Sequence, residues 1–455
     1  MAKVSKRVLL TGAGVCVLLG LMLPISNFFL PRDQIKVEGG TPEFAAASRV
    51  LQKKCADCHS PDMTSYPIYF NLPIANQLIK EDIEEAQEHV TFSRAKLSGK
   101  ERFSTVAQAK IYSVMDSGEM PPAKYTLMHW DAGITQSDKD VILDWIKSEG
   151  KSIGVEAIPE DKNPFDPDTR KAALGKKLFH DKRLSGDDTV SCASCHALDK
   201  GGTDHLKTST GIKGQKGPVN APTVFNSAYN LAQFWDGRSP DLADQVSGPV
   251  DNPVEMGSNW EQVMSKLKED SEYQKEFADL YPEGMNAKSI ADAIANFEKT
   301  LITPGSAFDR FLAGDLKALK KDERKGYDLF VKNQCVTCHI GPALGGKSYE
   351  KMGVKGDYFA WRGNPTPADL GRYNFTKKEE DKYKFKVPTL RNVALTWPYF
   401  HDGSTSDLGE AVKIMAKYQN GVDLSDDDTG LIVKFLNSLT GQYEGKILTT
   451  ADKPN

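Results

Sequence analysis

The strongest constraint on this chain is a short motif, Cys-x-x-Cys-His, that occurs three times, at residues 55–59, 192–196 and 335–339. Two cysteines at this spacing can add to the two vinyl groups of one haem, and the histidine that follows then lies under the iron as its proximal ligand. A chain with 7 Cys and 8 His in 455 residues is expected to contain the motif roughly 0.002 times by chance. The sequence therefore predicts three covalently bound haem c groups, attached through Cys55, Cys58, Cys192, Cys195, Cys335 and Cys338 and ligated by His59, His196 and His339.

Other uses of these cysteines fit less well. A zinc site needs four protein ligands, and no second Cys-x-x-Cys lies at the spacing of a zinc ribbon. Haem attachment takes six of the seven cysteines, which leaves no disulfide framework. The formal net charge of −4 and the lack of a long basic stretch give no argument for nucleic acid as a partner.

The N-terminus predicts a membrane anchor. Three basic residues, Lys3, Lys6 and Arg7, precede an uncharged run of 24 residues at 8–31. As a helix this run would be about 36 Å long, which is enough to span a bilayer. A cleaved signal peptide is the alternative, but the run is long and no small-x-small cleavage site ends it. Because a basic flank stays in the cytoplasm, we expect a single-pass protein of the bacterial inner membrane with its haem domains in the periplasm.

The spacing of the motifs predicts the domain organisation. The motifs begin 137 and 143 residues apart, which favours three haem domains in series. A stretch with helical periodicity precedes each motif and another closes each domain, as in the cytochrome c fold. The predicted fold class is mainly α, with an N-terminal transmembrane helix followed by three tandem cytochrome c-like haem domains. The predicted parts are a cytoplasmic tip and anchor at 1–31 and haem domains at 32–157, 158–304 and 305–455.

The ligand on the far face of each haem decides its role, because a haem with two axial ligands carries electrons and one with an open face can do chemistry. In the first domain, Met120 precedes two prolines that keep its loop extended, which makes it the preferred ligand. The weaker candidates there are Met63, Met115, His89 and His129. In the third domain, spacing alone leaves Met352 and Met415 open.

The second domain lacks an equivalent methionine. Its motif is followed by a polar and aromatic run at 220–257 that contains Gln245 and Glu255. A carboxylate beside an open iron can take a proton from the inner oxygen of a peroxide and return it to the outer oxygen, which then leaves as water. The second haem is therefore the predicted site of chemistry.

Seven pieces of this sequence resemble the bacterial di-haem cytochrome c peroxidases, in the same order along the chain. They are "KLFHDKRLSGDDTVSCASCH", "NAPTVFN", "FWDGR", "NPVEMG", "CVTCH", "VPTLRNVALTWPYFHDGS" and "AVKIMAKYQ", within about residues 163–443. With the extra N-terminal haem domain and the predicted anchor, the whole chain resembles the tri-haem quinol peroxidases of Gram-negative bacteria.

The resemblance implies a role for each matching position. His196 would hold the peroxidatic haem, at which hydrogen peroxide reacts, with Gln245 and Glu255 on its distal side. His339 and Met415 would ligate the electron-transferring haem.

The resemblance also implies a connection between these two haems. Trp235 would lie between them and help electrons to pass, while Arg238 is a candidate contact of a haem propionate. A calcium ion would be bound by Asn220 and by the backbone carbonyls of Thr396 and Pro398, an all-oxygen site of the kind calcium prefers. His401 stays unassigned.

One position departs from the family pattern. The family usually carries a histidine in the loop after the peroxidatic motif that blocks the iron until the enzyme is partly reduced. Ile212 stands at that position, which predicts a permanently open iron. His205 is the alternative ligand.

The sequence thus predicts a peroxidase that reduces hydrogen peroxide with electrons relayed through three haems. Membrane quinol is the expected donor, with a small c-type cytochrome as the alternative. The rival hypotheses are a non-catalytic tri-haem electron-transfer cytochrome and a di-haem oxidase that modifies a partner protein. The oligomeric state is not determined by the sequence, and a homodimer stays open.

Overall fold

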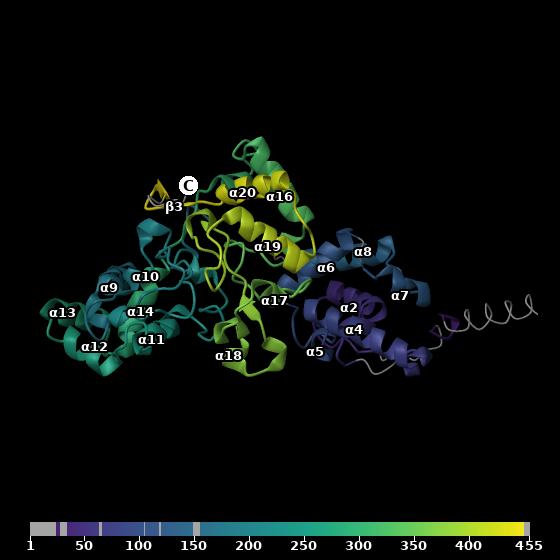
Figure 1. Ribbon diagram of the computed structural model, residues 1–455, viewed down its shortest axis with the longest axis horizontal. Helices are drawn as coiled ribbons and strands as arrows, with labels where there is room; N and C mark the ends of the chain where they lie inside the picture. The colour runs from purple at the N-terminus through teal and green to yellow at the C-terminus, as the bar shows by residue number, and fades with distance from the viewer. Residues whose placement is uncertain are drawn as a thin grey trace, which may run out of the picture. The chain divides into compact units, whose positions relative to one another are not determined.

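The computed structural model describes residues 24–27, 34–62, 66–103, 105–117, 120–148 and 155–449. Two compact units make up the chain, Met1–Ile153 and Gly154–Asn455. Helices dominate both units (Figure 1). The further division of the second unit into the parts 158–304 and 305–455 stays a prediction.

Short helices around the first motif form the first unit. They are α2 (Pro42–Lys54), α3 (Ala56–His59), α4 (Pro73–His89), α5 (Arg94–Leu97), α6 (Thr105–Ser117), α7 (Ala123–Met128) and α8 (Gln136–Ser148).

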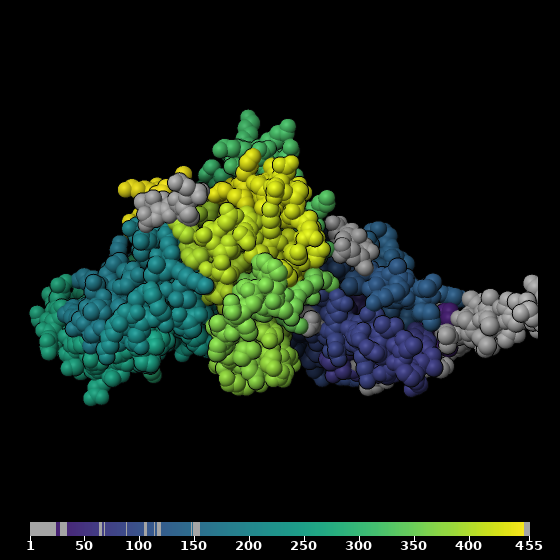
Figure 2. Space-filling model, in the orientation of Figure 1, coloured from purple at the N-terminus to yellow at the C-terminus, as the bar shows by residue number. Residues whose placement is uncertain are grey.

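The second unit contains the other two motifs. Its helices are α9 (Thr169–His180), α10 (Cys192–Cys195), α11 (Leu242–Asp251), α12 (Trp260–Leu267), α13 (Ser271–Leu280), α14 (Ala287–Glu298), α15 (Ala307–Leu312), α16 (Lys321–Lys332), α17 (Tyr358–Arg362), α18 (Tyr373–Thr376), α19 (Leu408–Asn420) and α20 (Asp426–Asn437). Two antiparallel pairs of short strands complete it: β1 (Tyr349–Lys351) with β2 (Lys384–Lys386), and β3 (Gln442–Tyr443) with β4 (Lys446–Ile447). In the space-filling view, the light green segment that includes α17 and α18 protrudes as a lobe (Figure 2).

The same arrangement recurs around each motif. A helix before the motif packs against a later helix, as α2 does with α8, α9 with α14, and α16 with α20. Helix α2 ends one residue before Cys55, and α16 ends three residues before Cys335. The packing of each pair therefore fixes where the motif that follows begins.

Local sequence explains where these helices begin. The Thr41 hydroxyl accepts the N–H of Phe44 at the start of α2, and the Asp168 carboxylate accepts two N–H groups at the start of α9. Such caps satisfy N–H groups that have no partner inside the helix. Helix α20 begins after Ser425 with three aspartates in its first turn, where the helix dipole favours negative charge.

Aromatic side chains fill the helix pairs. In the first unit, the ring of Phe44 meets that of Trp145 edge-on at 5.5 Å, and Phe103 meets the same indole at 5.5 Å. In the second unit, Phe308 and Phe330 both contact Phe435 of α20. All six side chains are buried, so apolar residues of the paired helices and of neighbouring segments form the cores.

Two glycines allow helices of the second unit to cross closely. A Cβ atom at Gly175 of α9 would lie 1.9 Å from the carbonyl oxygen of Ala293, and one at Gly326 of α16 would lie 2.0 Å from that of Leu431. Both distances are far inside van der Waals contact. The absence of a side chain at these positions is therefore required for the crossing.

We predict that Gly326→Ala destabilises the protein although alanine is the better helix former. Separating α16 from α20 should cost about 1–3 kcal/mol, more than the roughly 1 kcal/mol that alanine contributes to a helix. Gly430→Ala on α20 is the matched control, because Gly430 is exposed and its Cβ would meet nothing within 4 Å. Thermal unfolding of the haem-loaded protein should show a lower Tm for the first variant and an equal or higher Tm for the control. Equal Tm values for both variants would contradict the close crossing.

The predicted transmembrane helix is wrong on the evidence of the structure. Among the described residues, no helix is long and apolar enough to cross a bilayer. Most of the predicted segment, at 1–23 and 28–33, lies outside the described residues. Asn27, which is described, is buried, and its Nδ2 donates to the carbonyl of Met128 at 2.8 Å and to the hydroxyl of Tyr69 at 3.2 Å.

These contacts give the physical reason for the correction. An uncharged run can be covered by protein as well as by lipid, and hydropathy alone does not separate the two cases. The prediction of a transmembrane helix in the fold class is therefore wrong, and so is the single-pass inner-membrane location that depended on it.

Candidate functional site

The three motif histidines share one hydrogen-bonding arrangement. Each has its Nδ1 within hydrogen-bonding distance of a backbone carbonyl: His59 with Val90 (2.9 Å), His196 with Gly202 (3.4 Å) and His339 with Leu344 (3.1 Å). An Nδ1–H that donates to a carbonyl fixes the tautomer and leaves the lone pair of Nε2 for a metal. Burial lowers the pKa of all three histidines, that of His339 to about 4. They are therefore neutral near pH 7, as an iron ligand must be.

The motif cysteines are also in the form that haem attachment needs. All six are unbridged thiols and partly buried. Burial raises the thiol pKa to about 12 for Cys55, Cys192 and Cys335, and to about 11 for Cys58 and Cys195. A pair of neutral thiols followed by a neutral imidazole fits covalent haem c.

Glu255 is half-buried and lies close enough to the second motif to act on it electrostatically. Its negative charge contributes to the raised thiol pKa of Cys195. Burial raises the pKa of the Glu255 carboxyl, although Arg238 and the Asn252 amide, which donates to its Oε1 at 2.8 Å, act in the opposite direction. A half-buried carboxyl with a raised pKa suits a group that exchanges protons.

Gln245 and Arg238 lie nearby in the sequence but have different contacts. Gln245 is half-buried on α11. Arg238 pairs with Asp236 at 2.9 Å, and its guanidinium lies 3.5 Å from the ring centre of Phe234. The roles expected for both residues stay predictions.

Trp235 connects the segments that carry the second and third motifs. Its indole N–H donates to the carbonyl of Asn220 at 2.9 Å, and its own carbonyl accepts the N–H of Lys386 at 2.7 Å. The indole packs against a buried cluster made by Tyr358, Phe359, Phe385, Ile414 and Tyr418. Since Ile414 precedes Met415, this position agrees with a location between the two haems.

His205 is engaged away from the second motif. Its Nε2 is 2.9 Å from the carbonyl oxygen of Leu395, and its ring stacks on Trp397 with 4.0 Å between ring centres. Its Nε2 is therefore already hydrogen-bonded, whereas its buried Nδ1 has no hydrogen-bond partner among the described residues. Ile212 is buried, and its N–H donates to the carbonyl of Glu255 at 2.8 Å.

The candidate ligands of the first unit lie in different surroundings, and Met120 as the sixth ligand stays a prediction. His129 bonds through both ring nitrogens, to the hydroxyl of Tyr69 and the carbonyl of Tyr125, each at 3.2 Å. Met115 is 2% exposed within the apolar core. Met63 lies outside the described residues, and Met120 is half-buried on the stretch that leads into α7.

The third motif has its methionine candidates in different surroundings. Met352 packs against the aromatic cluster around Trp235. Met415 is half-buried on α19, between the buried residues Ile414 and Ala416. Met415 keeps the role that the resemblance implies, as a prediction.

Asn220, one of the residues expected to bind calcium, is bonded to the segment that follows the other two, Thr396 and Pro398. Asn220 is buried, its N–H donates to the carbonyl of His401 at 2.7 Å, and its Nδ2 donates to Leu206 at 2.9 Å. These bonds use the donors of Asn220 and leave its Oδ1 as an acceptor. Thr396 and Pro398 precede His401 by five and three residues, and their role as calcium ligands with Asn220 stays a prediction.

A network around His401 was missed by sequence reasoning. The ligand atoms of Asp369, His401 and Asp402 all lie within 4.8 Å of one another. However, Arg362 pairs with Asp369 at 2.7 Å and with Asp402 at 2.6 Å, and His401 Nε2 is 2.7 Å from Asp369. A guanidinium already balances these carboxylates, so the group is an ionic network and not a cation site. The ring of His401 also meets that of Trp235 edge-on, with 6.3 Å between ring centres. Nothing in the sequence indicates this contact, because the two residues are far apart in the chain.

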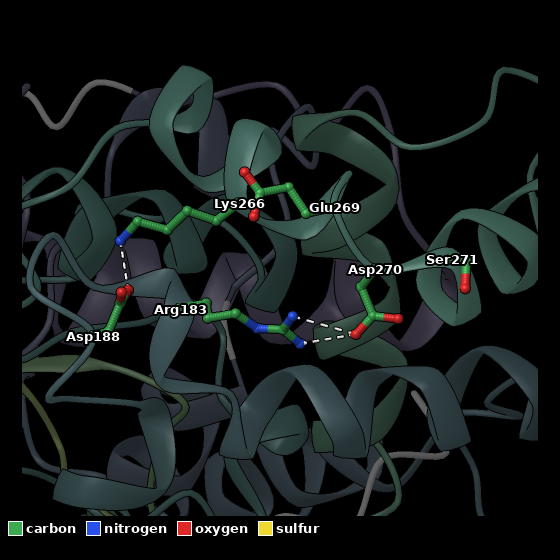
Figure 3. Close-up of a pocket in the computed structure, with 6 residues that line it drawn as sticks. All are labelled: Arg183, Asp188, Lys266, Glu269, Asp270 and Ser271. Atoms are coloured by element: carbon green, nitrogen blue, oxygen red, sulfur yellow. Dashed lines mark hydrogen bonds and ion pairs between the residues drawn. The ribbon is translucent and has the colours of Figure 1, made fainter.

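A polar pocket of about 450 Å³ lies elsewhere in the second unit (Figure 3). It is lined by Arg183, Asp188, Lys266, Glu269, Asp270 and Ser271. Arg183 pairs with Asp270 at 3.2 Å, and Lys266 pairs with Asp188 at 2.5 Å. The pocket contains none of the predicted haem residues.

Comparison with known proteins places the chain. Residues 169–317 match the di-haem cytochrome c peroxidase family, residues 25–148 match a haem-binding domain, and residues 323–440 match cytochrome c. The cytochrome c peroxidase Ccp of Escherichia coli K12 is 46% identical over 454 residues, which cover 95% of this chain and 96% of that protein. The chain belongs to the di-haem cytochrome c peroxidase family. The predicted family is confirmed, as is a mainly helical fold with cytochrome c domains.

Other relatives agree with this membership. The cytochrome c551 peroxidase of Nitrosomonas europaea is 48% identical over 295 residues, 64% of this chain and 87% of that protein. A crystal structure of a MauG-like protein associated with microbial copper homeostasis aligns with a TM-score of 0.55 at 28% identity, over 63% of this chain and 93% of that one. The chain is therefore an oxidoreductase that acts on hydrogen peroxide and carries covalent haem c.

Proposed function

We propose that this enzyme carries three haem c groups and reduces hydrogen peroxide at the haem held by His196. The observation that carries the proposal is the half-buried carboxyl of Glu255, which acts electrostatically on Cys195 of the second motif and whose own pKa is raised by burial. Haem supplies the iron that binds peroxide and the electrons that cleave its O–O bond. The polypeptide supplies the proton exchange.

Glu255 is the proposed proton carrier. Its carboxylate would accept a proton from the oxygen nearer the iron and return it to the outer oxygen, which leaves as water. Asn252 donates to Oε1 of this carboxylate at 2.8 Å, which holds it in one orientation and leaves Oε2 for the proton. The half-buried Gln245 would orient the peroxide by donating from its amide.

Electrons would enter at the haem of the first unit, pass to the haem held by His339 and Met415, and reach the catalytic haem past Trp235. The contacts of Trp235 with Asn220 on one side and Lys386 on the other support this path. A calcium ion at Asn220, Thr396 and Pro398 would hold the same region, because the carbonyl of Asn220 accepts the indole N–H of Trp235.

The electron donor separates two forms of this proposal. A reduced c-type cytochrome is the donor that the names of the relatives suggest, and a quinol is the donor expected for the tri-haem subtype. Steady-state peroxide consumption should be measured with reduced cytochrome c, with a water-soluble quinol, and with a small artificial donor. Turnover with none of the three would contradict peroxide reduction by this protein.

Met120→Ala tests the first haem as the entry point. Loss of the sixth ligand should convert one haem from low spin to high spin, with all three haems still attached. Turnover with reduced cytochrome c or with quinol, whichever supports the wild type, should fall several-fold more than turnover with a small artificial donor. The artificial donor can reduce the later haems directly. Met115→Leu is the matched control, because Met115 is part of the core and should keep a low-spin spectrum. An unchanged spectrum in Met120→Ala would point to another ligand.

A further inference from the structure

Lys386 is a buried cation that lacks a partner. It lies on β2 with 7% of its surface exposed. Among the residues that the structure describes, no hydrogen bond or ion pair reaches its Nζ. Arg391, which is 0% exposed, shows the usual arrangement, since it pairs with Asp309 at 2.7 Å and donates to Ser306. An unpaired buried ammonium is unfavourable, so its partner is expected to be a group outside the polypeptide.

The surroundings of Lys386 carry excess positive charge. Asp236 is the carboxylate that acts on Lys386 electrostatically. This carboxylate already accepts Arg238 through both oxygens, at 2.9 and 3.1 Å. Arg372 adds a second guanidinium, which donates to the backbone carbonyl of Asp236 at 2.9 Å. Arg372 also pairs with Asp381 at 4.0 Å, so two carboxylates lie among three cations, and the positive charge that stays unbalanced favours an anion.

The direction of the side chain follows from the strand. Phe385 stacks on His401 with 4.3 Å between ring centres. Because neighbouring residues of a strand point to opposite faces, Lys386 leaves on the other face, together with its cross-strand neighbour Tyr349. The guanidinium of Arg372 lies 3.8 Å from the ring centre of Tyr349, on the same face as the lysine.

The strand continues directly into the surroundings of the third motif histidine. Two residues after Lys386, the carbonyl of Pro388 lies near enough to His339 to act on the pKa of its ring. The N–H of Leu390 donates to the carbonyl of Leu344, which is also the partner of Nδ1 of His339. Lys386 therefore stands beside the haem expected at His339, while its own N–H is bonded to Trp235.

We propose that Nζ of Lys386 binds a propionate carboxylate of the haem held by His339. The proposal rests on the third haem of the proposed function. Propionates are the anionic groups of haem, and an ammonium is a suitable point-charge partner for a carboxylate. The contact would fix the edge of this haem relative to Trp235. It would also raise the reduction potential of the haem, because a nearby cation disfavours the more positive ferric state.

Redox titration of Lys386→Met tests this assignment, because methionine keeps the length of the side chain and removes its charge. At a fixed applied potential, the ratio of reduced to oxidised third haem should fall about tenfold, which is about 59 mV for a one-electron couple. The other two haems should keep their potentials. The third haem is identified as the couple whose spectrum changes in Met415→Ala.

Two further variants separate this role from a general effect of charge. Lys384→Met removes the same charge two residues away, from a side chain that is 28% exposed and 3.7 Å from Asp381, and should leave all three potentials near those of the wild type. Lys386→Arg keeps the positive charge, so the reduction potential of its third haem should stay close to that of the wild type. Equal shifts in Lys384→Met and Lys386→Met, or no shift in either, would overturn the proposal.

A structure of the haem-loaded wild-type enzyme decides the matter if Lys386→Met fails to fold. The proposal requires Nζ within about 3 Å of a propionate oxygen of the His339 haem. An Nζ bonded only to Asp236, or to the haem at His196, would overturn it. Failure of the proposed function is a separate result, since that would appear as absent peroxide turnover in the wild type with this contact still in place.

Discussion

Replacing Glu255 with glutamine is expected to lower peroxide turnover by roughly 100-fold or more, the usual scale for the loss of a general acid–base group. The amide has nearly the same shape and can still accept the hydrogen bond that Asn252 makes to Oε1. It cannot accept and release the proton that must move between the two peroxide oxygens. Haem content and the spectra of all three haems should stay close to those of the wild type, and turnover is measured as the initial rate of peroxide consumption.

The pH dependence of the same reaction gives a second measurement. Burial raises the pKa of Glu255 above its ordinary value, and the group must be ionised to take a proton. Activity should therefore be present above this raised pKa and be lost as the pH falls through it, at a pH less acidic than for an exposed glutamate. The residual activity of Glu255→Gln should lack this acidic limb.

Glu261→Gln is the control for the loss of one negative charge, because Glu261 is exposed in the first turn of α12. It should retain wild-type turnover and the acidic limb. Near-normal turnover in Glu255→Gln would remove Glu255 from the mechanism.

The sequence alone was sufficient for the parts of this protein that depend on short-range pattern. The cysteines and histidine of a motif are neighbours in the chain, so haem attachment could be predicted without a fold. The same holds for helices such as α9, which a capping residue and apolar spacing mark in advance. The order of the matching pieces then identified the family, which the comparisons confirm.

Contacts between distant parts of the chain could not be predicted in this way. Lys386 reads as one more charge in a lysine-rich stretch, and only the fold shows that it is buried beside Trp235. The ionic network of Arg362 and Asp369 likewise includes His401, which is 32 residues beyond Asp369, so sequence proximity could not predict it. The error at the N-terminus has the opposite origin, since a local apolar pattern was read as membrane although Asn27 is bonded to protein groups.

The fully oxidised enzyme is expected to have one high-spin haem that binds cyanide and reacts with peroxide without prior reduction. Isoleucine at position 212 has no atom that can donate to iron. Its side chain is buried and directed at Gly257, where an added Cβ would lie 2.2 Å from Ile212 Cδ1. The backbone of the loop is held by the bond from the N–H of Ile212 to the carbonyl of Glu255. Apolar packing therefore keeps this loop against residues 254–257.

Ile212→His should reverse this behaviour. An imidazole at position 212 would be destabilised in the apolar contact with Gly257, because its polar nitrogens would have no partner there. Ligation to the iron would give it a partner. The resting variant should show three low-spin haems and require partial reduction before it consumes peroxide, which absorption and electron paramagnetic resonance spectra can follow. Ile212→Leu is the matched control, because it keeps an apolar side chain and should keep the high-spin haem.

His205 provides the remaining test of an open iron. With its Nε2 bonded to Leu395 and its ring stacked on Trp397, His205→Ala should leave the spin state of the resting enzyme unchanged. The contrary result would be an oxidised wild type with three low-spin haems that does not react with peroxide, together with a high-spin signal in His205→Ala. In that case the loop moves far enough to bring His205 to the iron, and the site is gated. The spin state of the resting enzyme therefore distinguishes a peroxidase that is always ready from one that reduction must switch on.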